Sequence, residues 1–212
     1  MDIIPNFAVF EGGDGSGTTT QLSMLTERLK NTAKPVFFPT FEPTDGRIGR
    51  KIRVALKRRI DPKKLARLFA EDRSEHLYGP GGILERVNRG ELVVSDRYVL
   101  SSLVYQGIEC GDKLVKKLNS RFPAPEVLIF LDIEPEIAIS RIAARAGTRE
   151  IYEYHDFQVK VREKYKSLLE TYRREGVRVQ TIDASKSAQE IADRVWSVLC
   201  EMPIFKVSEN SF

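Results

Sequence analysis

The residues with the clearest chemical purpose form a glycine-rich loop near the N-terminus. Gly12, Gly17 and Thr19 stand at the spacing of a phosphate-binding loop, directly after an apolar run at Phe7–Phe10. Glycines suit this task because backbone amides must converge on phosphate oxygens in conformations that a Cβ would obstruct. A helix expected to begin near Thr18 adds free amides and a favourable dipole. The loop therefore predicts a site for nucleotide phosphates, with the Thr19 hydroxyl as a Mg²⁺ ligand.

One residue departs from this loop pattern. The pattern has a lysine after its last glycine, which reaches the β- and γ-phosphates, whereas this chain has Thr18. A glycine-rich turn without that lysine is also compatible with a purely structural role. The loop alone therefore leaves both interpretations open.

A second polar feature follows the apolar run at Leu92–Ser95. Asp96 and Arg97 come directly after this run, and open α/β sheets bind their ligands at the carboxyl ends of strands. Asp96 could hold Mg²⁺ or its water, and Arg97 could grip a phosphate. A surface ion pair is the alternative, but the position after a buried strand favours a ligand site.

These residues need a scaffold, and the alternation of apolar and periodic segments predicts one. The apolar runs are nearly continuous and rich in β-branched and aromatic residues, which is typical of parallel strands buried on both faces. Their alternation with helical segments predicts an α/β fold in three layers, with a parallel five-stranded sheet flanked by helices. The expected strands are Phe7–Phe10, Pro35–Phe38, Leu92–Ser95, Val127–Asp132 and Arg178–Ile182. The expected helices are Thr19–Asn31, Pro62–Val87, Glu134–Arg145, Phe157–Glu175 and Ala188–Cys200.

Length and charge are those of one ordinary globular domain. The 212 residues include 34 basic and 30 acidic side chains, a net charge of +4, which suits anionic ligands but demands neither nucleic acid nor a membrane. No apolar run approaches the roughly 18 residues of a membrane-spanning helix, and Cys110 and Cys200 are expected to be free thiols. We therefore expect a cytoplasmic protein with a single domain at residues 1–200 and a C-terminal tail at 201–212.

Four segments, taken together and in this order, resemble the thymidylate kinase family. They are Phe10–Gly17, Glu42–Gly46, Leu68–Arg73 and Asp96–Gly107. The similarity runs from about Phe7 to Leu199. It implies a P-loop kinase fold, transfer of the ATP γ-phosphoryl group to dTMP with Mg²⁺ to give dTDP and ADP, and a homodimer.

The resemblance also implies a role for each residue at a matching position. The ATP phosphates would lie on Gly12, Gly13, Asp14, Gly15, Ser16, Gly17, Thr18 and Thr19, and Mg²⁺ would be held at Thr19 and Asp96. The acceptor nucleotide would be bound by Glu42, Pro43, Phe69, Arg73, Arg97, Ser102, Tyr105 and Gln106. In that set Phe69 would stack on thymine, Arg73 would hydrogen-bond its carbonyl edge, and Arg97 would bind the acceptor phosphate. From the residues alone, a core Phe69 and a solvated Arg73 would be the simpler interpretation. Asp14 would face the acceptor and help to place nucleotide and metal.

An arginine-rich segment at residues 141–154 is a candidate lid. Mobile arginines that close over the site lower the barrier, because charge accumulates on the oxygens of the transferred phosphoryl group. The family places a catalytic arginine either in the glycine-rich loop or in the lid, and the loop position after Asp14 is Gly15. The lid must then supply it, and Arg145 and Arg149 are the candidates. A charged, exposed helix end is the alternative.

Two positions depart from the family pattern and leave other functions open. Thr18 replaces the loop lysine, and Phe41 stands where the family usually has an arginine that contacts the acceptor phosphate. The alternative is therefore a catalytically impaired nucleotide-binding protein on the same fold, unless a downstream cation compensates; the candidates are Arg47, Arg50 and Lys51. The basic runs at residues 57–59 and 63–64 also raise nucleic-acid binding, but solvated helix faces explain them better, because no aromatic residues are interleaved.

Overall fold

The chain forms one parallel five-stranded sheet, in the order β2-β3-β1-β4-β5. The structure is a computed structural model and describes residues 1–30, 35–58, 60–146 and 151–206, with the backbone alone described at 145–146 and 151–154. The strands are β1 (Ile3–Gly12), β2 (Phe37–Phe41), β3 (Leu92–Asp96), β4 (Ala124–Asp132) and β5 (Arg178–Asp183). All pairings are parallel. The predicted fold class is therefore confirmed.

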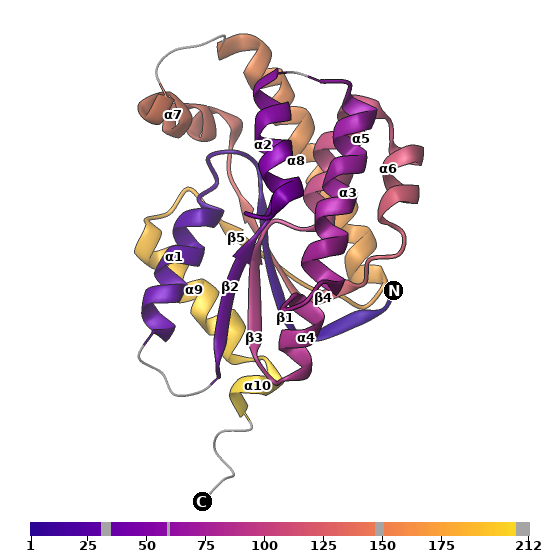
Figure 1. The fold of residues 1–212 in the computed structure, drawn as a ribbon. Coiled ribbons are helices and arrows are strands. Elements are labelled where there is room, and N and C mark those ends of the chain that lie inside the picture. Colours follow the sequence, from indigo (N-terminus) through magenta and orange to yellow (C-terminus); the bar gives the residue numbers. More distant parts are fainter. Residues whose placement is uncertain (31–34, 59, 147–150, 207–212) are drawn as a thin grey trace, which may run out of the picture.

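Helices cover both faces of this sheet, which gives the three expected layers (Figure 1). They are α1 (Thr18–Leu29), α2 (Arg47–Arg58), α3 (Pro62–Tyr78), α4 (Ile83–Asn88), α5 (Val99–Cys110), α6 (Asp112–Asn119), α7 (Pro135–Ala146), α8 (Ile151–Arg174), α9 (Ala188–Cys200) and α10 (Pro203–Lys206). The core follows the two-residue alternation of the strands. In β1, Ala8 and Phe10 pack with α1 and α9, whereas Phe7 and Val9 pack with α3 and α4.

One predicted helix is divided in the structure, and several helices of the structure were not predicted. The helix expected at Pro62–Val87 is divided into α3 and α4, because Gly79 and Pro80 interrupt it and Gly81 has a φ of 68°. A side chain at Gly79 would come within 2.4 Å of the Glu75 carbonyl oxygen. The helices α2, α5 and α6 were not among the expected ones, and they carry or flank much of the site described below.

The segment expected to be a tail begins as part of the fold. Met202 is fully buried, and Phe205 in α10 packs edge-on against Trp196 at 5.5 Å between ring centroids. Residues 207–212 lie outside the described part. Within the described residues, no helix is both long and apolar enough to cross a membrane. Cys110 and Cys200 are free thiols on separate helices.

The strand order brings the chemically interesting segments to one edge of the sheet. Phe10 in β1 is paired with Asp96 in β3, so the glycine-rich loop and Arg97 leave the sheet side by side. The next strand, β2, ends beside them, and the Glu42 amide donates to the Asp96 carbonyl oxygen at 3.0 Å. Three segments far apart in the sequence therefore meet at the carboxyl ends of three adjacent strands.

Candidate active site

The glycine-rich loop has the backbone that a phosphate cradle needs. Gly15 and Gly17 have φ values of 81° and 95°, in the left-handed region where glycine is favoured. A Cβ at Gly15 would also come within 2.7 Å of the Ala138 carbonyl oxygen. The Ser16 hydroxyl is buried and has no hydrogen-bond partner in the described part of the chain. The loop therefore leaves amides and a hydroxyl available at the N-terminus of α1, where an anion is stabilised.

The predicted metal ligands lie in contact with each other. Thr19 Oγ1 donates to Asp96 Oδ2 at 2.6 Å. The other carboxylate oxygen, Asp96 Oδ1, is buried and finds no partner among the described residues. A hydroxyl beside a carboxylate oxygen with an unused lone pair is a donor set that Mg²⁺ accepts. The residues present thus fit the Mg²⁺ ion that the resemblance implies.

One cavity of about 270 Å³ collects every residue predicted to bind the acceptor. Glu42, Pro43, Phe69, Arg73, Arg97, Ser102, Tyr105 and Gln106 all line it, together with Asp14 from the glycine-rich loop. Four further lining residues were not predicted: Leu56, Tyr98, Ser101 and Glu109. The cavity combines apolar and aromatic walls with polar and charged side chains that converge on the same space, as small-molecule sites do.

Arg73 is held inside this cavity by a buried ion pair. Its side chain is 1% exposed, and Nε and Nη2 donate to Glu42 Oε2 at 2.9 and 2.6 Å. Nη2 also donates to Ser102 Oγ and the Tyr98 carbonyl oxygen, and Nη1 donates to Asn119. Arg73 is therefore not solvated, which overturns the simpler interpretation from the residues alone.

Glu42 is in turn fixed from its other side. His76 Nδ1 lies 3.1 Å from Glu42 Oε1, and the other ring nitrogen lies 2.6 Å from Thr40 Oγ1. On the same helix α3, the Asp72 carboxylate accepts from the Thr44 amide and hydroxyl at 2.8 and 2.7 Å. Two successive turns of α3 therefore hold the Glu-Pro segment in place, and with it the acceptor wall.

Arg97 joins the acceptor cavity to the glycine-rich loop. Its Nη2 donates to Asp14 Oδ1 at 2.9 Å and its Nη1 to the Gly12 carbonyl oxygen at 3.2 Å. Tyr105 donates its phenol to the same Asp14 oxygen at 3.1 Å, and burial raises the pKa of this phenol above its ordinary value. Tyr105 therefore stays a neutral donor. Asp14 and Arg97 lie at the boundary between the two sides, where a phosphoryl group would be transferred.

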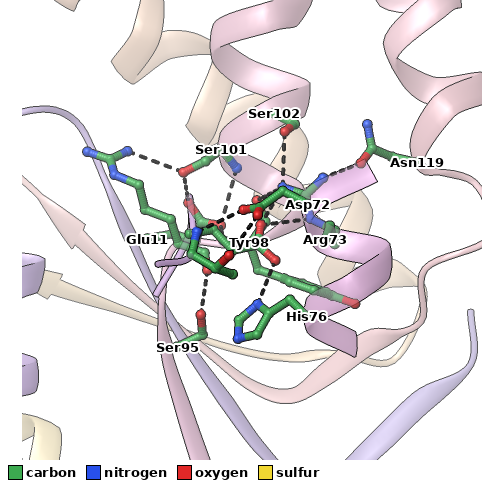
Figure 2. A network of polar contacts seen from close by, with 12 residues as sticks. Glu11, Asp72, Arg73, His76, Ser95, Tyr98, Ser101, Ser102 and Asn119 are labelled. Carbon is green, nitrogen blue, oxygen red and sulfur yellow. Dashed lines mark hydrogen bonds and ion pairs between the residues drawn. The ribbon is translucent and has the colours of Figure 1, made fainter. Parts of the chain in front are cut away.

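Glu11 is a site residue that the sequence reasoning missed. Its side chain is fully buried at the end of β1, and burial raises its pKa to about 7, against the opposing effect of hydrogen bonds from Ser101 and Tyr165. The available signal was a single carboxylate that directly follows the apolar run of β1. A buried carboxylate at that place requires partners. Tyr98 and Ser101, at the start of α5, lie beside Glu11 (Figure 2), and Tyr165 of α8 also donates to it.

A second cavity, of about 380 Å³, opens on the other side of the loop. Gly15 and Gly17 line it, and so do two cations, Arg141 and Lys186. Arg141 is half-buried with Nη1 at 3.5 Å from the Gly15 carbonyl oxygen, whereas Lys186 is exposed in the turn before α9. The lid candidates stay predictions, because the Arg145 side chain and the whole of Arg149 lie outside the described part.

The proposed substitutes for the missing arginine at Phe41 are placed elsewhere. Arg47, Arg50 and Lys51 line a separate groove between α2 and α3 and are not among the lining residues of the acceptor cavity. Arg50 does contact the Glu-Pro segment, donating to the Asp45 carbonyl oxygen at 2.6 Å, but it does not line the acceptor cavity. Arg53 also reaches this segment, donating to the Pro43 carbonyl oxygen at 2.9 Å, and its guanidinium lies 5.8 Å from the Phe41 ring centroid.

The parallel sheet, the loop at its carboxyl edge and the two flanking cavities are the features of a P-loop kinase α/β fold. A sequence model of the family described as thymidylate kinase matches residues 10–195. The chain belongs to the thymidylate kinase family.

Relatives in distant organisms carry the same family name. A protein of Treponema pallidum (strain Nichols) named as a thymidylate kinase is 42% identical over 199 residues, covering 92% of this chain and 95% of its own. A protein so named in Pyrobaculum aerophilum is 42% identical over 203 residues, covering 94% of this chain and 99% of the relative. One from Methanocaldococcus jannaschii is 34% identical over 201 residues, covering 93% and 97%. The similarity thus extends over nearly the full length of both partners.

Proposed function

We propose that this protein phosphorylates dTMP, transferring the γ-phosphoryl group of ATP to give dTDP and ADP. The observation that carries the proposal is the cavity beside the glycine-rich loop, because all eight residues expected to bind the acceptor line this one cavity. The family membership of the chain supports the same reaction. The relatives that are named as thymidylate kinases do not favour the impaired nucleotide-binding alternative.

The acceptor residues divide into base and phosphate contacts. Phe69 is half-buried on the cavity wall, where its ring can stack on thymine. Arg73 offers a fixed guanidinium, whose geometry Glu42 sets before the nucleotide arrives. Arg97 supplies the cation for the acceptor phosphate, next to Asp14. Because these groups are already oriented, little side-chain freedom is lost on binding.

Thr19 and Asp96 would hold Mg²⁺ at the loop. When bound, the ion neutralises charge on the β- and γ-phosphates of ATP. The loop amides, the Ser16 hydroxyl and the N-terminus of α1 would bind the phosphates directly. Arg141 and Lys186 line the adjacent cavity and would contribute positive charge on the side where the loop itself has Thr18. Arg145 and Arg149 are proposed as lid cations that complete the site.

We also propose, from the family resemblance, that the protein is a cytoplasmic homodimer. Light scattering coupled to size-exclusion chromatography tests the oligomeric part, because the monomer mass is 24.1 kDa. A single species at the monomer mass across micromolar concentrations would contradict it.

A coupled assay with ATP, Mg²⁺ and a panel of nucleoside monophosphates tests the proposed reaction. We expect turnover with dTMP, weaker turnover with dUMP, and background rates with AMP, GMP and CMP. Removal of Mg²⁺ with EDTA should abolish turnover, and Mg²⁺ in excess should restore it. Tight binding of ATP and dTMP without any product would instead establish a nucleotide-binding protein.

A further inference from the structure

The backbone of Arg97 adopts a conformation that few residues other than glycine adopt. Its φ is 72°, in the left-handed region. Arg97 stands at the change from β3 to α5, and this conformation turns the chain sharply there. Neighbouring atoms hold both sides of the turn. The Arg97 amide donates to the Phe10 carbonyl oxygen at 2.9 Å, and Ser95 Oγ donates to the Arg97 carbonyl oxygen at 2.7 Å.

The next anchor of this turn is the buried carboxyl of Glu11. Glu11 Oε1 accepts from the amides of Tyr98 and Ser101 at 3.0 and 3.2 Å. These amides belong to the N-terminus of α5, where Tyr98 itself makes no side-chain cap. Helix termini have free amides that need acceptors. Glu11 therefore caps α5 from the neighbouring strand β1, across 87 and 90 positions of sequence (Figure 2).

The second carboxyl oxygen of Glu11 is connected to the Arg97 guanidinium through the Ser101 hydroxyl. Glu11 Oε2 accepts from Ser101 Oγ at 2.6 Å and from Tyr165 Oη at 3.0 Å. Ser101 Oγ lies 3.2 Å from Arg97 Nη1 and accepts from it. One carboxyl thus fixes the backbone on the C-terminal side of Arg97 and the hydroxyl that receives its side chain.

We propose that Glu11 is a positioning residue for Arg97, which it keeps aimed at the acceptor phosphate by fixing the first turn of α5 and the Ser101 hydroxyl. This inference rests on the proposed function only for the identity of the acceptor. It needs no charge on Glu11. The amides of Tyr98 and Ser101 can only donate, but the hydroxyls of Ser101 and Tyr165 can donate or accept. A glutamine at this position can therefore satisfy all four groups.

The test compares Glu11→Leu, Glu11→Gln and wild type, with Tyr165→Phe and Tyr172→Phe as a matched pair. The two tyrosines lie seven residues apart on α8 in the same apolar cluster. Of the two, Tyr165 donates a hydrogen bond to Glu11 and Tyr172 does not. Glu11→Leu should raise KM for dTMP by about tenfold or more, and KM for ATP by less than about twofold, since two amides lose their acceptor. Glu11→Gln should recover most of that loss. Tyr165→Phe should raise KM for dTMP by about two- to fivefold and Tyr172→Phe should not.

A double-mutant cycle separates positioning from general damage. In an Arg97→Met background, Glu11→Leu should raise KM for dTMP by less than a further factor of about two, because the guanidinium that Glu11 positions is gone. Multiplicative effects of the two substitutions, or equal changes in KM for ATP and dTMP, would overturn the proposal. If Glu11→Leu does not unfold cooperatively, Glu11→Gln and the two tyrosine variants are compared with wild type instead, because Tyr165 Oη also lies 2.9 Å from Ser101 Oγ. Identical kinetics for Tyr165→Phe and Tyr172→Phe would also overturn the proposal.

A readout without turnover keeps this test apart from the proposed reaction. The side-chain Nε–Hε resonance of Arg97 in the ligand-free protein, assigned by its loss in Arg97→Met, should move in Tyr165→Phe and Glu11→Leu and stay in place in Tyr172→Phe. If the Arg97 resonance does not shift in either Tyr165→Phe or Glu11→Leu, Glu11 does not position Arg97. Wild-type protein that shows this pattern but does not phosphorylate dTMP would instead refute the proposed function alone.

Discussion

The two sides of the glycine-rich loop are built differently. On the acceptor side, Arg73 and Glu42 form an ion pair with both side chains at most 2% exposed, and the carboxylate of Asp72 fixes the adjacent segment. On the donor side, the described cations are the half-buried Arg141 and the exposed Lys186. The acceptor side is thus organised before any ligand binds, whereas the donor side presents cations with few restraints. Selectivity for the acceptor is consistent with the first arrangement, and closure over ATP with the second.

The largest effect that separates the two sides should come from Arg73→Met. This change leaves Glu42 as a buried charge without its main partner, which costs about 3–5 kcal/mol of stability. It also removes the guanidinium from the acceptor cavity, so dTMP binding should fall while ATP binding changes little. Urea unfolding and calorimetric titration with each nucleotide measure the two effects.

A double variant controls for the unpaired charge. Arg73→Met combined with Glu42→Gln should regain part of the lost stability, because a neutral amide then replaces the buried carboxylate. It should not regain dTMP binding. Equal stability of the single and double variants would show that the ion pair is not what holds this wall.

The second effect concerns the pH dependence of stability through Glu11. Its pKa is about 7 in the folded chain and has an ordinary value of 4.5. Between these values the folded state binds more protons than the unfolded state, so this group's contribution to stability falls as pH rises from about 4.5 through 7. A difference of about 2.5 pKa units corresponds to at most about 3–4 kcal/mol.

Comparison with Glu11→Gln isolates this contribution from other titrating groups. The variant cannot lose the proton, so its stability relative to wild type should increase with pH across that window and level off above it. Urea unfolding at several pH values between 4 and 8.5 measures the difference. If the difference in stability between Glu11→Gln and wild type does not change with pH, then Glu11 has the same pKa in the folded and unfolded states.

Local signals predicted the scaffold and much of the site, and long-range pairing explains what was missed. Each apolar run, like the glycine spacing of the loop, is a pattern within a few consecutive residues. The sheet and the loop could therefore be predicted from the sequence. The role of Glu11 depends on Ser101, which is 90 positions away. Arg53 was missed for a related reason: its function depends on which face of α2 turns toward Pro43, and α2 was not among the expected helices.

The acceptor residues themselves came from the family pattern and not from local physics. Phe69 and Arg73 are four residues apart on α3, and this spacing alone is equally compatible with a core aromatic and a solvated cation. Only the meeting of α3 with Glu42 and Ser102 distinguishes the two cases. A resemblance thus supplied information that depends on tertiary contacts.

A smaller effect is expected from the donor side with Lys186→Met. Lys186 lines the donor cavity but is exposed and forms only a 3.9 Å ion pair with Asp183. Its contribution to ATP binding is therefore screened by solvent, and KM for ATP should rise by about three- to tenfold with KM for dTMP unchanged. Lys117→Met, an exposed lysine of α6, is the matched control. If both variants behave alike, Lys186 does not contact the nucleotide.

The smallest change should come from Thr18→Lys, which restores the usual residue of the loop. Thr18 is 5% exposed at the first position of α1, so its surroundings are packed around a short side chain. A lysine there must leave this packing to reach the phosphates, and Arg141 and Lys186 already place positive charge in the adjacent cavity. We therefore expect kcat with dTMP to rise by less than about threefold, since one exposed charge pair contributes little. Thr18→Val, which keeps the shape and removes the hydroxyl, controls for packing. A gain of a hundredfold would show that the donor side lacks an essential cation, and that the asymmetry between the two sides is a loss of function and not an alternative design.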